Sequence, residues 1–469
     1  MHLLIQNKGE AHIESFTLLG ASNSRGEGVI GQFGSGTKHA INVLLREGIE
    51  FFVYCGKTKL TFFTKEEELG QAGREKTHRK VYCKLSGTSN RTIDLGWVLD
   101  FGAMDWTEVS MALREFVSNA IDETVLTTGG FIDAKENGDL CVEPTNQVRA
   151  KAGYTRIYVE ASHPDVQRFL FELPKRFLHF SKNPQDVYAT ILPKADRNLS
   201  GGTPMIYREG VFVREIRETK TPSLFDYNFS GKQFTIDESR NSSEYAIRAK
   251  CAEVLSNSDA DTLSKFIRAF GEGQDVFETG LDPYYLQPTW RTPTDEQKQN
   301  WATAFEQTFT RAVCCVKDSN AAPYVQKKGY RIVTLPSNQM ADVFRTFGIR
   351  TAADVLDENE RNGREPVETT QAAVKALDEV WGWIEQLNLA NGRERPELGV
   401  FRAHTDGECD VMGFYKDGKV WVRDDIASEV NQFLKKVVLE ECVHYITGAN
   451  DRTLDIQNFL ISMIVEVCG

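Results

Sequence analysis

Gly31-Gln32-Phe33-Gly34-Ser35-Gly36-Thr37-Lys38 decides how the first half of this chain is interpreted, and an apolar helical run at 39–46 follows it directly. Three glycines and a small hydroxyl residue leave backbone N–H groups uncovered, and a following helix points the positive end of its dipole into the loop. These features are typical of a phosphate-binding loop. A glycine-rich turn between a strand and a helix has the same pattern, so this stretch alone leaves both interpretations open.

Length and composition limit the class of protein. The chain has 469 residues, of which 41% are hydrophobic and 26% are charged, and these values are typical of a globular protein with two to four domains. A net charge of -12 disfavours nonspecific binding to nucleic acid. We see neither an apolar run long enough to cross a bilayer nor a signal peptide, so we expect a cytoplasmic protein without membrane contact.

Nine cysteines are present, and none of their pairs has the two-residue spacing of a zinc or redox motif. An odd number of cysteines without such spacing is typical of a reducing compartment. We therefore predict that they are small buried hydrophobic residues.

A second informative stretch, residues 106–126, predicts a helix packed on a sheet. Its apolar residues recur at steps of three and four. Glu115, Asn119 and Asp122 are spaced at i, i+4 and i+7, so they share one face of that helix. Such a face can be merely solvated, but the neighbouring phosphate-loop pattern favours a functional role.

The remaining pattern predicts strands early in the chain and a mixture of elements later. We expect strands near 3–6, 50–54 and 60–64, an exposed charged connection at 65–80, and a further strand at 156–160. A proline-rich and aromatic stretch at 281–293 suggests the main domain boundary, and a helix over 296–314 is expected to follow it.

Glu115-Phe-Val-Ser-Asn119-Ala-Ile-Asp122 has the pattern E-x-x-x-N-A-x-D. It resembles the N-box of the GHKL ATPases, the Bergerat-fold group that includes gyrase-type topoisomerases, heat-shock chaperones, mismatch-repair ATPases, histidine kinases and the MORC proteins. Gly31-Gln-Phe-Gly34-Ser-Gly36-Thr-Lys38 is similar to the second glycine box of this group. Gly20-Ala21-Ser22 resembles the G-x-S of the lid that precedes that box.

The order of these motifs departs from the group, because the N-box here follows the glycine boxes. A circular permutation would explain this order if the first glycine box opens the chain, and Asn7-Lys8-Gly9-Glu10-Ala11 stands where the group has D-x-G-x-G. Asn7 would then replace the aspartate that accepts the adenine amino group. An asparagine carbonyl accepts the same hydrogen bond without charge assistance.

The resemblance implies a role for each matching residue. Glu115 would orient or deprotonate the attacking water, and Asn119 would supply an oxygen to Mg²⁺. Asp122 would support the nucleotide site. The residues implied in nucleotide binding are Asn7, Gly9, Ser22, Gly31, Gly34, Ser35, Gly36, Thr37, Lys38, Asn119 and Asp122.

Near the C-terminus, Val437-Val-Leu-Glu440-Glu441-Cys-Val-His444 is similar to the HExxH helix of zinc metallopeptidases. Glu440 stands where the first histidine should be. Glu440 and His444 could form a zinc-like site that Asp451 or Asp455 completes, with Glu441 available as the base. Alternatively, an inactive relative could keep the fold without the metal, or the helix could simply end in a histidine near its C-terminal dipole.

We therefore predict a permuted Bergerat-type α/β sandwich at 1–185, with a mixed sheet and helices on one face. A β-rich extension with a helical connector would occupy 186–293, and an α+β domain, zincin-like and degenerate, would occupy 294–469. The leading hypothesis is an Mg²⁺-dependent ATPase that switches its own contacts, as a homodimer, or those of a protein partner. A nucleotide sensor without catalysis and a metal-dependent hydrolase in the C-terminal half, with Zn²⁺ as its metal, are the alternatives.

Overall fold

The computed structural model describes residues 1–18, 30, 35–69, 76–87, 90–101, 103–194, 202–217, 221–236, 242–288, 290–317, 319, 321–362, 364–403, 411–448 and 459. The chain is a mixed α/β protein that divides into two compact units. The first comprises Met1–Phe309 with Thr346–Gly348, and the second Thr310–Arg345 with Ile349–Gly469. Residues 1–293 lie within the first unit, and the boundaries predicted at 185 and 293 remain predictions.

A seven-stranded sheet organises the start of the first unit, with the order β5-β4-β3-β2-β7-β1-β6. Its strands are β1 (His2–Lys8), β2 (Phe51–Cys55), β3 (Thr58–Leu69), β4 (Lys76–Ser86), β5 (Arg91–Val98), β6 (Cys141–Thr145) and β7 (Tyr154–Glu160). Every neighbouring pair is antiparallel. The prediction of a mixed sheet is therefore wrong. Short connections reverse the chain direction between β2, β3, β4 and β5. The pairs β2–β7, β7–β1 and β1–β6 join strands that are far apart in the chain, and they are antiparallel too.

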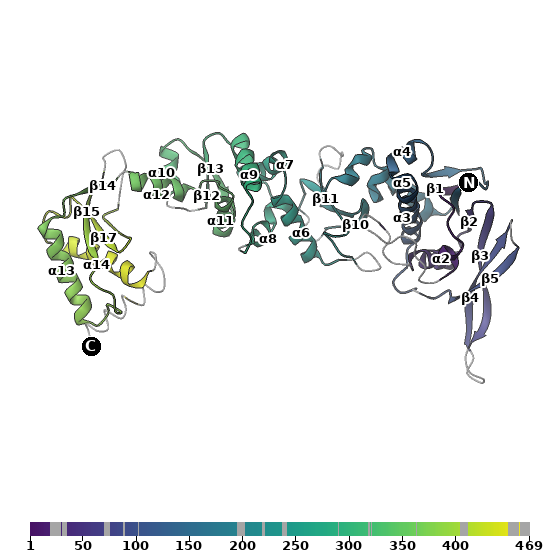
Figure 1. Ribbon diagram of the computed structural model, residues 1–469, viewed down its shortest axis with the longest axis horizontal. Coiled ribbons are helices and arrows are strands. Elements are labelled where there is room, and N and C mark those ends of the chain that lie inside the picture. The colour runs from purple at the N-terminus through teal and green to yellow at the C-terminus, as the bar shows by residue number, and fades with distance from the viewer. Residues whose placement is uncertain are drawn as a thin grey trace. The chain divides into compact units, whose positions relative to one another are not determined.

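Helices cover one face of this sheet, as predicted (Figure 1). They are α2 (Gly36–Arg46), α3 (Val109–Thr128) and α5 (Pro164–Arg176), accompanied by the short α1 (Glu14–Thr17) and α4 (Phe131–Glu136). The core between sheet and helices includes Leu3, Val53, Leu113 and Phe169. Odd-numbered residues of β1 face this core, so Asn7 points to the helical side with Leu3 and Ile5.

Polar contacts fix α2 in place. The His39 ring is stacked between Phe101 and Trp106, with centroid distances of 4.6 and 5.0 Å. Asn42 accepts a hydrogen bond from Trp97 Nε1 at 3.1 Å, and Arg46 donates to the Leu99 carbonyl at 3.0 Å. Helix α2 is consequently held along its length against β5 and the connection that leads into α3.

The exposed connection predicted for 65–80 is wrong, because most of it forms the arms of a long β3–β4 hairpin. Glu66 pairs with Arg79, and Glu67 pairs with His78. Many of the side chains on both faces of these arms are exposed or only partly buried, so the sequence has no apolar alternation to indicate a strand. Residues 70–75 lie outside the described part.

A second sheet, with the order β10-β9-β11-β8, matches the predicted β-rich extension. Its strands are β8 (Ile191–Pro193), β9 (Met205–Arg208), β10 (Val211–Glu215) and β11 (Phe225–Phe229), after the 3-10 turns η1 (Leu178–Phe180) and η2 (Pro184–Tyr188). Helices α6 (Glu244–Ser256), α7 (Ala260–Gly271), α8 (Pro283–Leu286) and α9 (Asp295–Thr308), with η4 (Phe277–Gly280), complete this unit. The helix predicted for 296–314 ends at Thr308, and Cys314 lies in a strand.

Two sheets occur in the part of the second unit that the structure describes. Strands β12 (Ala312–Val316) and β13 (Arg331–Leu335) are parallel and accompany α10 (Ala322–Lys327), α11 (Asn338–Thr346) and α12 (Ala352–Asn362). The other sheet has the order β14-β15-β17-β16 and is formed by β14 (Arg364–Val367), β15 (Glu397–Ala403), β16 (Gly413–Lys416) and β17 (Lys419–Arg423). Helices α13 (Gln371–Gln386) and α14 (Gln432–Thr447) share a core with it.

The cysteines and the apolar helices of the described residues bear on the predictions made from composition. All seven described cysteines are free, and all but Cys141 are buried, as predicted for small hydrophobic residues. None of the helices in the described ranges has both the length and the apolarity needed to span a bilayer.

Candidate functional site

The predicted N-box helix lies against the first turn of α2. Asn119 Nδ2 donates a hydrogen bond to Thr37 Oγ1 at 2.9 Å. A Cβ atom added at Gly36 would lie 2.5 Å from Glu115 Oε2, so the glycine leaves the space that this carboxylate occupies. Gly36 and Glu115 are 79 residues apart in the chain, so two distant motifs meet at one place.

Asp122 reaches the segment just before α2. Its Oδ1 accepts a hydrogen bond from the Ile30 backbone N–H at 2.8 Å, and its side chain is buried at 4% exposure. Glu115, Asn119 and Asp122 therefore all face the glycine-rich segment, as their helical spacing predicted. Ser22, Gly31 and Gly34, which the sequence analysis also placed in this site, lie outside the described residues.

Lys38 brings positive charge to the same end of α2. Its side chain is only 1% exposed, and its ammonium donates to the Ser15 carbonyl at 3.0 Å. Burial lowers the pKa of this ammonium to about 8, because a charged group loses hydration energy away from water. The first N–H groups of an α-helix have no acceptor one full turn back, so the start of α2 adds oriented donors here, although the Lys38 N–H donates to the Ser35 carbonyl at 2.9 Å.

Two residues that the sequence analysis did not single out also belong to this region. Arg114 Nε lies 3.5 Å from Glu115 Oε1, and both side chains are largely buried. The Ser118 hydroxyl is fully buried, and among the described residues it has no hydrogen-bond partner. Both lie inside the E-x-x-x-N motif or next to it, but periodicity alone could not show that they face inward.

The predicted first glycine box, at the end of β1, contacts α3 farther along that helix. Asn7 is 5% exposed, and its Nδ2 donates to the Lys8 carbonyl at 3.0 Å. Gly9 has a φ of +105°, and a Cβ atom there would lie 2.9 Å from Glu123 Oε1 on α3. The end of β1 and the start of α2 therefore contact α3 about two turns apart, or roughly 12 Å along its axis.

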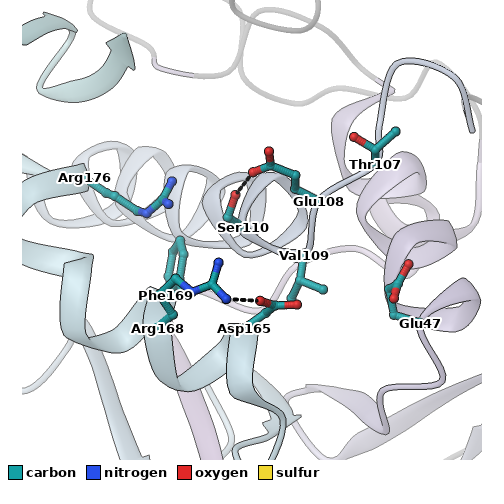
Figure 2. A pocket seen from close by; sticks show the side chains of 9 residues that line it. All are labelled: Glu47, Thr107, Glu108, Val109, Ser110, Asp165, Arg168, Phe169 and Arg176. Atoms are coloured by element: carbon teal, nitrogen blue, oxygen red, sulfur yellow. Dashed lines mark hydrogen bonds and ion pairs between the residues drawn. The ribbon is translucent and has the colours of Figure 1, made fainter. Parts of the chain in front are cut away.

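A pocket of ≈ 280 Å³ lies at the beginning of α3, where α2 ends and α5 begins (Figure 2). It is lined by Glu47, Thr107, Glu108, Val109, Ser110, Asp165, Arg168, Phe169 and Arg176. Its two arginines are paired: Arg168 lies 3.0 Å from Asp165, and Arg176 lies 2.6 Å from Glu172. None of the predicted site residues lines this pocket.

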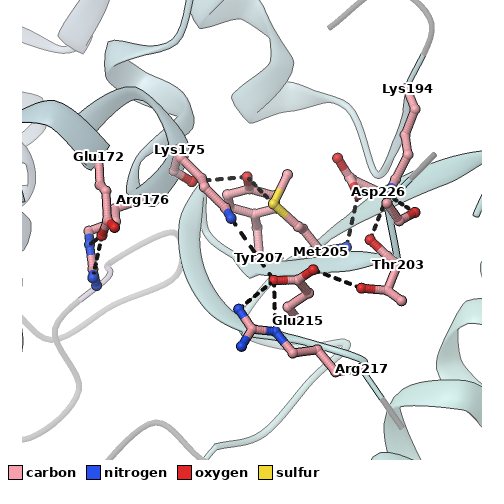
Figure 3. A network of polar contacts seen from close by, with 11 residues as sticks. Glu172, Lys175, Arg176, Lys194, Thr203, Met205, Tyr207, Glu215, Arg217 and Asp226 are labelled. Atoms are coloured by element: carbon pink, nitrogen blue, oxygen red, sulfur yellow. Dashed lines mark hydrogen bonds and ion pairs between the residues drawn. The ribbon is translucent and has the colours of Figure 1, made fainter. Parts of the chain in front are cut away.

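Another polar network occupies the second sheet of the first unit (Figure 3). Lys194 Nζ lies 3.4 Å from Asp226 Oδ1 and donates to the Gly202 and Thr203 carbonyls at 2.6 and 2.5 Å. Asp226 also accepts from the Met205 N–H at 2.8 Å. Because these contacts join the ends of β8, β9 and β11, we interpret the network as a structural one.

The predicted zinc-like site is not assembled in the described residues. Glu440 and His444 both lie on α14, and Asp451 lies outside the described part. Glu441 is 8% exposed and packs beneath β16, where a Cβ atom at Gly413 would lie 3.0 Å from its Cγ. No group of three or more metal-binding side chains occurs within the described ranges.

Comparison with known proteins gives no further assignment: no family model matches this chain, and no curated protein does.

Proposed function

We propose that this protein binds ATP with Mg²⁺ in its first unit and hydrolyses the terminal phosphate. The observation that supports this best is the meeting of Glu115 and Asn119 with the first turn of α2. A carboxylate, an amide, a buried amine and a helix N-terminus at one place are the groups that phosphate transfer to water requires.

The phosphates would lie at the start of α2. Backbone N–H groups there and the positive end of the helix dipole favour anions. Lys38 adds a buried ammonium near the same end of the helix, and its positive charge would favour a bound phosphate.

Asn119 fits a magnesium site. Its Nδ2 is used in the bond to Thr37, and within the described residues no donor reaches its Oδ1. An amide oxygen is a hard ligand of the kind that Mg²⁺ prefers. The bound ion would bridge phosphate oxygens and neutralise their charge.

Glu115 would act as the base or the orienting group for water. It lies one helical turn from Asn119, and its carboxylate occupies the space beside Gly36. A base must be within hydrogen-bond distance of the water it activates, and this position is next to the expected phosphate.

The base of the nucleotide would lie toward Asn7 and Gly9. Asn7 points to the helical side of the sheet, and its Nδ2 is used by the Lys8 carbonyl. Its Oδ1 is then oriented to accept a hydrogen bond, which favours an exocyclic amino group such as that of adenine.

Occupation of the site would be transmitted through Ile30, whose N–H is bound by Asp122. This link connects the N-box helix with the segment preceding α2, so phosphate binding there would change the contacts of the protein with itself or with a partner. We propose homodimerisation or partner binding as the output of this switch.

Calorimetry and phosphate release on the full chain test the proposal. The parent protein should bind a non-hydrolysable ATP analogue only with Mg²⁺ and should hydrolyse ATP. Glu115→Ala should retain binding and lose about 10²-fold or more in rate, because it removes the base. Glu136→Ala, an exposed carboxylate on α4, is the matched control and should leave both unchanged.

Absence of ATP binding in all magnesium conditions would exclude this function. Hydrolysis by Glu115→Ala at the parental rate would exclude the role of Glu115. Tight binding without phosphate release by the parent would instead support the second candidate, a nucleotide sensor, for which the neutral Asn7 is the motivating residue.

A metal-dependent hydrolase in the second unit is the third candidate, and it rests only on the Glu440 and His444 pattern. Metal analysis of the purified chain checks it. Bound zinc that disappears in His444→Ala would support it, and a metal-free protein would remove it.

A further inference from the structure

The seven-stranded sheet has a second face that the helices described above do not cover. Residues on the helical side, such as Leu3, Val53 and Leu60, belong to the main core. Leu4, Phe52 and Tyr158 instead form a separate small cluster on the opposite face, where they are buried at 7%, 5% and 0% exposure. The accessible side chains of that face lie mainly on β3 and β4. In Figure 1, α2, α3 and α5 all lie on one side of the strands.

The strand registers define the composition of this open face. One row across neighbouring strands contains Tyr158, Phe52, Thr61, Lys84 and Thr92. The next row contains Arg156, Tyr54, Lys59 and Ser86. A third row contains Phe63, Tyr82 and Asp94. Aromatic rings from β2, β3 and β4 and lysines from β3 and β4 thus occur in neighbouring rows of this face.

The charge of this face is opposite to that of the whole chain. Its part on β3, β4 and β5 carries Lys59, Lys65, Lys80 and Lys84 against Glu67 and Asp94. Lys80 lies between both carboxylates, 2.5 Å from Asp94 and 3.5 Å from Glu67. Four lysines against two carboxylates give this part of the face a net positive charge, although the net charge of the chain is -12.

Two of these lysines extend over aromatic rings. Lys59 Nζ lies 4.0 Å from the centroid of Phe52, and Lys65 Nζ lies 4.9 Å from that of Tyr82. Lys84 is exposed, while Tyr54 and Phe63 are partly exposed. The face therefore offers cations and aromatic surfaces side by side on a rigid sheet.

We propose that this open face, defined by Tyr54, Lys59, Phe63, Lys65 and Lys84, binds single-stranded nucleic acid. Lysines neutralise the phosphates, and partly exposed rings stack with unpaired bases, which is how sequence-tolerant binding of single strands works. Four neighbouring strands span about 15 Å, enough for a few nucleotides. An acidic protein surface would match the lysines but would make no use of the rings.

Fluorescence anisotropy with a labelled oligothymidylate of roughly 16 nucleotides tests this inference, without ATP so that the result is independent of the proposed function. The parent protein should bind in low salt and lose affinity as salt rises. A triple variant, Lys59→Gln, Lys65→Gln and Lys84→Gln, should bind about tenfold or more weakly. The slope of log K against log salt should fall in magnitude by about 2, because each lost phosphate contact removes about 0.7.

The matched control carries the same change of charge elsewhere in the first unit, at the exposed Lys175, Lys182 and Lys265, and should bind like the parent. Phe63→Leu keeps an apolar side chain without a ring and should weaken binding several-fold with the salt slope unchanged. Thermal melting of each variant verifies folding.

Three results would overturn the inference. The parent could fail to bind the oligonucleotide at low salt, or the control could lose as much affinity as the triple variant. The face would be a contact between two copies if the triple variant, and not the control, changed the sedimentation of the free protein.

Discussion

Protonation of Lys38 should be coupled to the binding of ATP. The ammonium is buried beside the start of α2, and its pKa in the free protein is lowered to about 8. A bound phosphate favours the charged form, so the pKa rises again in the complex. Binding above pH 8 must therefore take up a proton.

The pKa sets the size of this effect. At pH 9, about nine-tenths of the free protein has a neutral Lys38, so binding takes up about 0.9 proton; at pH 7 the uptake is about 0.1. The dissociation constant for ATP should be about tenfold larger at pH 9 than at pH 7. Lys38→Arg should lose this dependence, because a guanidinium stays charged.

Calorimetry in two buffers with different heats of ionisation counts the protons directly. Comparison with Lys38→Arg and Lys38→Met removes the contribution of the nucleotide's own phosphates. Equal proton uptake by parent and variants at pH 9 would refute the assignment of Lys38 to the phosphate site. The folding stability of the nucleotide-free protein depends on pH in the opposite direction from ATP affinity. Between pH 8 and 10.5, Lys38 binds more protons in the unfolded chain than in the folded one, so its contribution to the free energy of unfolding rises with pH.

Three further predictions concern α2 and α3. Gly36→Ala should slow hydrolysis about 10²-fold while retaining ATP binding, because its Cβ displaces the Glu115 carboxylate. Gly130→Ala, where a Cβ meets nothing within 4 Å, is the control, and equal hydrolysis rates in the two variants would contradict the role of Gly36. Asp122→Ala should weaken ATP binding about 10-fold to 100-fold in calorimetry, because the Ile30 N–H loses a charged acceptor, whereas the exposed Asp133→Ala should not. Leu113→Ala should destabilise the first unit by about 2–5 kcal/mol in denaturant melts, because Leu113 is buried in the core. Leu126 lies on the same helix but is 60% exposed, so Leu126→Ala should cost less than about 0.5 kcal/mol. Equal losses in the two variants would contradict the assigned packing.

Local pattern predicted much of the fold correctly. The stripe over 106–126 predicted α3, and the helical run predicted at 39–46 lies in α2. The helix begins earlier than predicted, because Gly36, Thr37 and Lys38 form its first turn instead of the end of the loop. The β3–β4 arms were missed because both of their faces are largely open to solvent, so alternation of apolar residues is absent. Strand direction was also mispredicted, since periodicity within one strand contains no information about its neighbours.

The sequence by itself determined that Glu115, Asn119 and Asp122 share a helix face, because helical periodicity depends only on local spacing. It also indicated a glycine-rich segment suited to phosphate. Only the tertiary structure decided that this face meets Gly36, Thr37 and Ile30, because that contact depends on how α2 and α3 pack on one sheet. Packing likewise buried Lys38 and placed Lys59, Lys65 and Lys84 together on the open face, since side chains distant in sequence become neighbours only through strand register.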